Sequence, residues 1–173
     1  MSAPLLEIIA LGPGDAAGAE AGGADRIEVV SAMEFDGLTP SPRTVRDIAY
    51  ETKLPLRCML RANDGFSTSG SEMSRLRGAA QELAAAGAHG FVLGFLNGES
   101  QVDVDACLVL LQSTDGLPWT FHRAIDYALD HDQAWRDVVQ LPGLDTVLTA
   151  GSARGVEDGI DELTTRAARD ASV

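Results

Sequence analysis

The sequence predicts an α/β protein in which strands and helices alternate and the strands form a parallel sheet. Short apolar runs with strand character recur along the whole chain, and longer segments with helical periodicity separate them. The predicted strands lie near residues 5–11, 26–30, 56–61, 90–95, 118–122 and 145–149. Their first residues are about 28 residues apart on average, a regular spacing that indicates six repeated strand–helix units.

Capping residues mark where two of the helices begin. Ser41 supplies a hydroxyl directly before Pro42, and proline is favoured at the first position of a helix. Asp130, followed three residues later by Gln133, resembles a capping box that opens the fifth helix. Both positions agree with the gaps between the predicted strands.

Each predicted helix has one face suited to packing on a sheet. The face of the third helix consists of Met73, Leu76, Ala80, Leu83 and Gly87. The face of the sixth consists of Val156, Ile160, Leu163 and Ala167. We therefore expect both stripes to be buried.

A length of 173 residues suits one domain, and no linker divides residues 1–173. Six units are present, whereas a closed parallel barrel has eight and about 250 residues. The chain is therefore expected to form either an open doubly wound sheet or a barrel that lacks its last two units.

The charge balance excludes several kinds of partner. Thirteen basic residues stand against 26 acidic ones, and the net charge of −13 opposes binding to nucleic acid or to an anionic membrane. No stretch approaches the ~18 apolar residues of a membrane-spanning helix, and the N-terminus lacks the basic region of a signal peptide. With only two cysteines and no disulfide framework, a cytoplasmic location is expected.

Charged residues interrupt the predicted strands, where a buried parallel sheet normally has aliphatic ones. Among them are Glu7, Glu28, Arg61, His122 and Arg123, with Asp126 just beyond the fifth strand. The carboxyl ends of parallel strands meet at one rim, so these side chains are expected to form a polar cluster there. The cluster is either a ligand site or an ion-pair network that only stabilises the sheet.

Two residues are candidate metal ligands. His122 is able to act as a general acid or base or as a ligand, but it is equally a neutral histidine held by a carboxylate. Cys58 lies beside Met59, and both are ligand types preferred by soft metals. Neighbours in a strand point to opposite faces, however, and cannot hold one ion together without distortion.

Five motifs resemble the CutC family of copper homeostasis proteins, in family order, over about residues 5–165. They are Leu6-Glu7-Ile8, Gly23-Ala24-Asp25-Arg26-Ile27-Glu28, Gly37-Leu38-Thr39-Pro40-Ser41, Thr120-Phe121-His122-Arg123-Ala124-Ile125-Asp126 and Val147-Leu148-Thr149-Ala150-Gly151. The resemblance implies a TIM-type barrel, a cytoplasmic protein of copper homeostasis, and a pocket at the carboxyl ends of the strands. It implies that this pocket is lined by Glu7, Glu28, Arg61, His122, Arg123 and Asp126.

The sequence also departs from the family. Many members have cysteines directly after Leu-Glu-Ile, where this chain has Ile9 and Ala10, so copper coordination is not expected there. The last two strand–helix units of the barrel are absent after Gly151 and the sixth helix. The first and sixth strands would then be edges with unpaired backbone groups, and we expect association with copies of the same chain.

Three functional hypotheses follow. In the first, the chain is a CutC-like protein of copper homeostasis that binds copper ion, with Cys58 as the metal ligand. In the second, it is an enzyme that acts on a small anionic metabolite: His122, Glu28 and Asp126 are catalytic, and Glu7, Arg61, Arg123 and Thr149 bind the substrate. In the third, it is a degenerate family member whose polar cluster is structural. No cofactor other than copper is expected.

Overall fold

Six parallel strands form one sheet in a computed structural model that describes residues 4–169. The strands are β1 (Glu7–Ala10), β2 (Arg26–Val29), β3 (Leu56–Met59), β4 (Gly90–Leu93), β5 (Trp119–Phe121) and β6 (Leu144–Val147). They are hydrogen-bonded in chain order, so β1 and β6 are the edges. All six predicted strands, and the parallel sheet, are confirmed.

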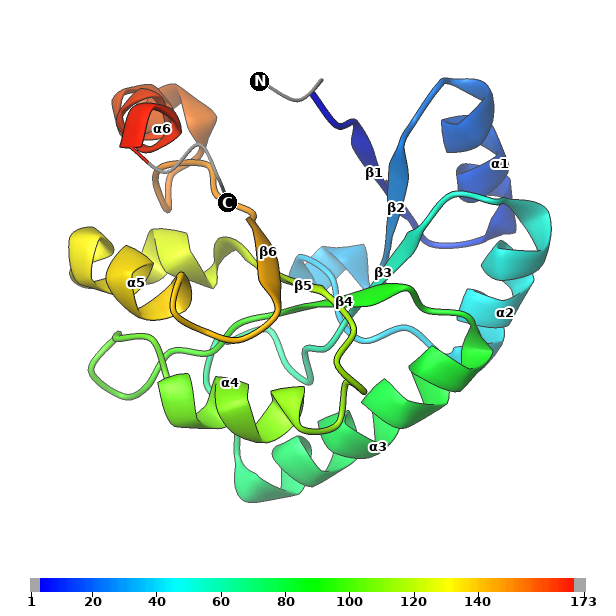
Figure 1. The fold of residues 1–173 in the computed structure, drawn as a ribbon, viewed down its shortest axis with the longest axis horizontal. Helices are drawn as coiled ribbons and strands as arrows, with labels where there is room; N and C mark the ends of the chain where they lie inside the picture. The colour runs from blue at the N-terminus through cyan, green and yellow to red at the C-terminus, as the bar shows by residue number, and fades with distance from the viewer. Residues whose placement is uncertain (1–3, 170–173) are drawn as a thin grey trace.

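A helix follows each strand and lies outside the sheet (Figure 1). The helices are α1 (Pro13–Ala21), α2 (Pro42–Glu51), α3 (Gly70–Ala86), α4 (Val104–Leu111), α5 (His131–Val138) and α6 (Val156–Arg169). Two short 3₁₀ helices, η1 (Met33–Phe35) and η2 (Arg123–Tyr127), follow β2 and β5. No helix within residues 4–169 is long and apolar enough to cross a membrane.

The sheet curls in the manner of a barrel. In a flat sheet β2 and β6, four strands apart, would be separated by roughly 19 Å. Instead, the Arg26 side chain on β2 reaches Thr146 Oγ1 on β6 at 3.5 Å, and Arg57 on β3 forms an ion pair with Asp145 on β6. Of the two expected architectures, the fold is therefore the incomplete TIM-type barrel, open between β1 and β6 (Figure 1).

The two faces of the sheet have different neighbours. Side chains such as Ile27, Cys58 and Phe91 pack against the helices in the main hydrophobic core. On the other face, Val30, Met59 and Val92 form a small separate apolar cluster inside the barrel. Residues that alternate along each strand therefore divide between the core and the barrel interior, where the site lies.

Both predicted helix starts are confirmed, whereas the capping box expected at Asp130 and Gln133 is not formed. The Ser41 hydroxyl accepts a hydrogen bond from the Thr44 N–H at 3.1 Å, and the Asp130 carboxylate accepts one from the Gln133 N–H at 2.9 Å. The Gln133 side chain donates to Asp137 instead of completing a capping box.

The expected face of α3 is confirmed for Met73, Leu76, Ala80 and Leu83, which are buried, whereas Gly87 lies just past the helix as its C-cap. The expected face of α6 is wrong: Val156 and Ile160 are 55% and 56% exposed. Helix α6 packs instead through Gly159, where an added Cβ would collide with the Ala150 carbonyl, and through Arg166, which lies over the Trp135 ring. Close backbone approach, rather than an apolar stripe, fixes this helix.

Candidate functional site

A pocket of about 200 Å³ opens at the carboxyl ends of the strands, inside the curve of the sheet. Its walls come from β1, β2 and β3 and from the segments that follow β2, β3, β5 and β6. The lining residues are Ile9, Glu28, Met33, Asp36, Met59, Arg61, Phe66, His122, Arg123, Tyr127 and Leu148. We call this cavity the barrel pocket; it contains four of the residues expected at the site.

His122 follows β5 and has one ring nitrogen without a partner. Its Nδ1 accepts a hydrogen bond from the Ala124 N–H at 3.2 Å, whereas Nε2 is buried and has no hydrogen-bond partner among residues 4–169. Burial, and secondarily the charge of Arg61, lowers the pKa of His122 from 6.5 to about 3. The imidazole is therefore neutral at physiological pH, with its proton on Nε2.

Glu28, on β2, is a buried carboxyl group that makes no hydrogen bond or ion pair with the rest of the described chain. Burial, and secondarily the negative charge of Glu7, raise its pKa from 4.5 to about 7, while the positive charge of Arg26 acts in the opposite direction. Near neutral pH the group is thus present in both protonation states, which suits proton transfer.

Glu7 does not line the barrel pocket. It lies at the start of β1, in register with Arg26 on β2, and the two side chains form an ion pair. The pair occupies the amino-terminal level of the sheet, below Glu28. Arg26 is therefore a partner that the strand pattern did not identify, although its place directly before Ile27-Glu28 and the register of parallel strands explain it.

Arg61 organises the rim of the pocket. Its guanidinium donates to the backbone carbonyls of Phe35 at 2.9 Å and Gly65 at 3.2 Å, and it lies over the Phe66 ring at 5.0 Å. The Thr39 hydroxyl makes two hydrogen bonds of 2.9 Å to the backbone of Arg61: it donates to the Arg61 carbonyl and accepts from the Arg61 N–H. Arg61 thus joins the loops after β2 and β3, and its donors are largely used within the protein.

The guanidinium group of Arg123 has one nitrogen that makes no hydrogen bond within residues 4–169. Its Nε donates to Asp126 at 2.9 Å and its Nη2 to the Ser152 carbonyl at 3.2 Å, which leaves Nη1 without a hydrogen bond in the described chain. Asp126 also accepts from the Ala150 N–H at 2.9 Å and from the Thr149 hydroxyl. Asp126 and Thr149 lie behind Arg123, outside the pocket lining, and hold it against the end of β6.

Aromatic side chains cover one side of the pocket. Phe66, from the loop between β3 and α3, lies 4.8 Å from the Tyr127 ring and 5.6 Å from the His122 ring, between centroids. The Phe66 carbonyl accepts from the Leu96 N–H at 2.9 Å, which fixes the loop. No pattern in this glycine- and serine-rich loop marks Phe66 in the sequence.

Cys58 faces away from the barrel pocket. It lies between Met59 and Arg57 on β3, fully buried against the helical layer, and burial raises the pKa of its thiol to about 12. Cys107 is likewise buried, in α4. In residues 4–169 no group of three or more His, Cys, Asp and Glu side chains is placed to hold a metal ion.

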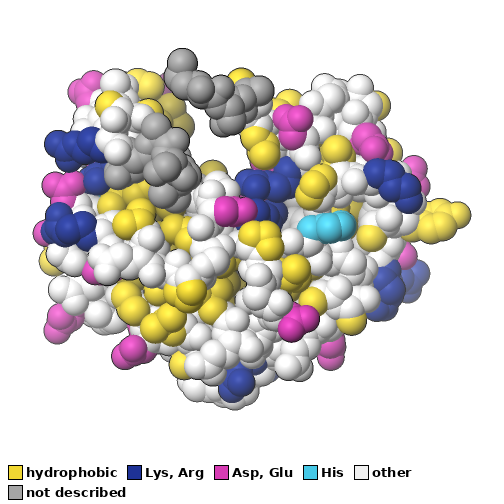
Figure 2. All heavy atoms as spheres, in the orientation of Figure 1, with side chains coloured by type: hydrophobic (Ala, Val, Ile, Leu, Met, Phe, Trp, Pro, Cys, Tyr) yellow, Lys and Arg dark blue, Asp and Glu magenta, His cyan; other side chains and the backbone are white. Residues whose placement is uncertain are grey.

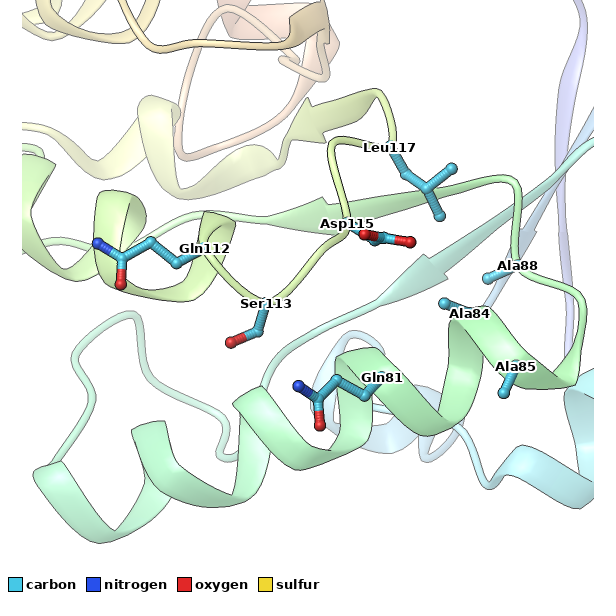
Figure 3. Close-up of a pocket in the computed structure, with 8 residues that line it drawn as sticks. All are labelled: Gln81, Ala84, Ala85, Ala88, Gln112, Ser113, Asp115 and Leu117. Atoms are coloured by element: carbon cyan, nitrogen blue, oxygen red, sulfur yellow. The ribbon is translucent and has the colours of Figure 1, made fainter.

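A larger groove of about 560 Å³ lies elsewhere, between α3 and the segment after α4 (Figure 3). Ala88 and Leu117, which line it, come just before β4 and β5, so it is at the amino ends of the strands. Asp115 is its one charged lining residue and is exposed. Across the face of the molecule drawn in Figure 2, acidic and basic side chains are interspersed with exposed apolar patches. Its buried polar lining residue, Ser113, accepts a hydrogen bond from Arg77, so the groove lacks the buried ionisable groups that distinguish the barrel pocket.

Comparisons with known proteins give one consistent result. The model of the CutC family matches residues 5–171. A copper homeostasis protein cutC homolog of Caenorhabditis elegans is 39% identical over 144 residues, which are 82% of this chain and 57% of that protein. A family protein CutC of Xanthomonas axonopodis pv. citri is 35% identical over 159 residues, 91% of this chain and 66% of its own length.

Solved structures agree with the sequence relatives. The copper homeostasis protein CutC from Streptococcus agalactiae superposes with a TM-score of 0.84 at 25% identity, over 95% of this chain and 83% of that one. A phosphonopyruvate hydrolase superposes with a TM-score of 0.66 at 17% identity, over 93% of this chain and 62% of that one, a likeness of fold alone. The chain spans less than two thirds of the curated relatives' length.

Proposed function

Because the chain belongs to the CutC family, we propose that it takes part in copper homeostasis and that its barrel pocket binds a small metabolite with a carboxylate or carbonyl oxygen. The observation that supports this most is the buried Nε2–H of His122, a donor with no acceptor in residues 4–169. A buried donor left unpaired is costly, and an oxygen atom of a ligand would satisfy it.

Charge and volume narrow the kind of ligand. The free Nη1 of Arg123 supplies a second, positively charged donor at the same pocket. A volume of about 200 Å³ is smaller than the roughly 300–1,000 Å³ of sites for drug-sized ligands. A molecule of a few carbon atoms with one anionic group fits both properties. The aromatic wall of Phe66 and Tyr127 would cover its apolar part.

Calorimetric titration with pyruvate, 2-oxobutanoate, lactate and acetate tests this proposal. We expect one or more of these anions to bind, and Arg123→Met to weaken that binding by about tenfold or more through loss of a charged hydrogen bond. Arg43→Met, on the exposed surface of α2, is the matched control and should bind as the unchanged protein does. Equal binding by both variants, or no binding of any anion, would contradict the proposal.

A second candidate function is direct binding of Cu(I), which the thioethers of Met33 and Met59 in the same pocket favour. Cys58 is not part of this candidate, since it faces the helices. Anaerobic titration with Cu(I) should then give binding that Met59→Leu weakens and Cys58→Ala leaves unchanged. The reverse pattern would contradict this assignment of ligands.

The proposed place of action is the cytoplasm. Both cysteines are free and buried, as is usual for proteins of reducing compartments. Fractionation of cells that express the chain, with detection by antibody, tests this, and recovery in a membrane or secreted fraction would contradict it.

A further inference from the structure

We infer that the barrel pocket catalyses proton transfer at a carbon atom next to a carbonyl group, with Glu28 as the base and the Nε2–H of His122 as the donor to the carbonyl oxygen. This inference rests on the proposed function, because it requires that a small oxygen-bearing molecule enters the pocket. It goes further by assigning a reaction class and a role to each of two residues.

The hydrogen bond at Nδ1 determines what His122 does. The Ala124 N–H has only a proton to offer, so Nδ1 must present its lone pair and the ring proton must reside on Nε2. Coordination of a metal through Nε2 would require loss of that proton. The ring is therefore built to donate a hydrogen bond to an oxygen atom.

The orientation of the ring is enforced by its surroundings. A Cβ added at Gly94, at the end of β4, would lie 2.9 Å from Nδ1 of His122, so only glycine leaves room for the ring in this place. Phe66 and Phe121 flank it, with centroids 5.6 Å and 6.1 Å away. The Nε2–H donor is thus fixed before any ligand arrives, which is the condition for effective electrostatic stabilisation of a developing negative charge.

Glu28 has the properties of a general base. Its carboxyl group lines the same pocket, from β2, and no hydrogen bond or ion pair in the described chain occupies it. Below it, Arg26 is engaged by Glu7, and so does not hold the Glu28 carboxylate in place. The pKa of about 7 leaves a large ionised fraction at neutral pH and makes that fraction a stronger base than an ordinary carboxylate.

The chemical step needs no reactant other than the bound molecule and solvent water. A Glu28 carboxylate oxygen bonds to the proton of the C–H group, and the electron pair of that bond becomes the new carbon–carbon double bond. The carbonyl π pair moves onto oxygen, where the His122 Nε2–H and the Arg123 guanidinium stabilise the negative charge. Glu28 then exchanges its proton with solvent and delivers a solvent-derived proton to the same carbon, which gives exchange. In a substrate with a hydroxyl group on that carbon, delivery to the former carbonyl carbon, with transfer of the hydroxyl proton to the former carbonyl oxygen, gives isomerisation instead.

Deuterium exchange tests the inference directly. The full chain is incubated in D₂O with pyruvate, 2-oxobutanoate, hydroxypyruvate or dihydroxyacetone phosphate, and loss of the C–H signal is followed by proton NMR. Binding of each probe is measured in the same samples by saturation transfer. We expect a bound probe to exchange about 10²-fold or more faster than in buffer, the usual contribution of a positioned base.

Variants separate the two roles. Glu28→Gln should abolish exchange while the probe still binds, and Glu28→Asp, which withdraws the carboxylate by one methylene, should retain part of it. His122→Phe should abolish exchange, and His122→Gln, which keeps an N–H donor, should restore some. Glu51→Gln on the exposed face of α2 is the control and should exchange at the unchanged rate.

The outcomes distinguish the two proposals. Binding of probes without exchange by the unchanged protein would overturn this inference and leave the proposed function standing. No binding of any probe would overturn the proposed function, and this inference with it. Exchange that persists in Glu28→Gln would remove Glu28 as the base.

Discussion

The imidazole of His122 and the backbone N–H of Ala124, two residues further along the chain, are joined by a hydrogen bond of 3.2 Å to Nδ1. This local contact, at the first turn of η2, places the ring proton on the nitrogen that faces no protein acceptor in residues 4–169. The chemistry proposed for the pocket depends on it, because the same ring with its proton on Nδ1 would be an acceptor or a metal ligand.

Glu28→Gln should stabilise the protein above neutral pH. The folded-state pKa of about 7 exceeds the ordinary value of 4.5, so the folded state binds the proton more tightly and stability falls as pH rises from about 4.5 to 7. The free energy of unfolding decreases by about 3 kcal/mol in total, and this loss is complete above pH 7. Glutamine, which is neutral, removes this loss.

Urea unfolding at about pH 5 and about pH 8 measures the effect. The free energy of unfolding of Glu28→Gln should exceed that of the unchanged protein at the higher pH only, and Glu51→Gln should show no such difference. A variant that is less stable at both pH values would contradict the assignment of Glu28 as an unpaired buried acid.

Gly90→Ala should destabilise the fold. An added Cβ would lie 2.5 Å from the Pro118 carbonyl and 2.8 Å from Cδ of Arg57, whose side chain crosses this position to reach Asp145. We expect a loss of about 2 kcal/mol, as for other overpacked sites. Gly78→Ala, on α3 with no atom near the added carbon, is the control and should be neutral or stabilising. Equal melting temperatures for both variants would contradict this account of the barrel interior.

Much of the fold was predictable because its signals are local. The strands and the caps at Ser41 and Asp130 depend on apolar runs and on residues three positions apart, and these are visible in the chain itself. Helix α6 was not predictable in this way. Its contact through Gly159 depends on where the Ala150 carbonyl lies, and periodicity contains no information about that.

The site was predictable to the level of the strand ends. Glu28, Arg61, His122 and Arg123 were expected together and line one pocket. The position of Glu7 at the amino-terminal end of β1, away from the pocket, was not predicted. The strand has only four residues, so its first residue lies at the end opposite the rim. The side to which Cys58 points depends on register, which is set by pairing with Val29 and Phe91 rather than by composition.

Asp126→Asn should weaken ligand binding as well as lower the stability of the fold. The Asp126 carboxylate accepts from Arg123, Thr149 and the Ala150 N–H, and an amide would direct its own donors at some of them. Arg123 would then lose its orientation toward the pocket. We expect a loss of about 1–3 kcal/mol in stability.

Titration of the Asp126→Asn variant with the anion that binds best checks this, with Thr149→Val as the milder companion change. An affinity equal to that of the unchanged protein, despite lower stability, would show that Asp126 does not position Arg123.

The chain should associate with copies of itself. Strand β1 is an edge, and Ile8 and Ile9 on it are 36% and 46% exposed, an arrangement that favours pairing with another chain. Analytical ultracentrifugation should detect a dimer or larger species, and Ile8→Lys should shift it to the monomer. A monomer at every concentration tested, with Ile8→Lys indistinguishable from it, would contradict the expectation.

The central claim, that His122 is a neutral imidazole with its proton on Nε2, is tested most directly by NMR of the chain labelled with ¹⁵N-histidine. His122→Gln assigns the signals, and the ring nitrogen shifts are followed from about pH 8 to about pH 5. The account predicts a protonated Nε2 and an unprotonated Nδ1 throughout, because the pKa of His122 is lowered to about 3. Protonation of the ring near pH 6.5, or a proton on Nδ1, would contradict it.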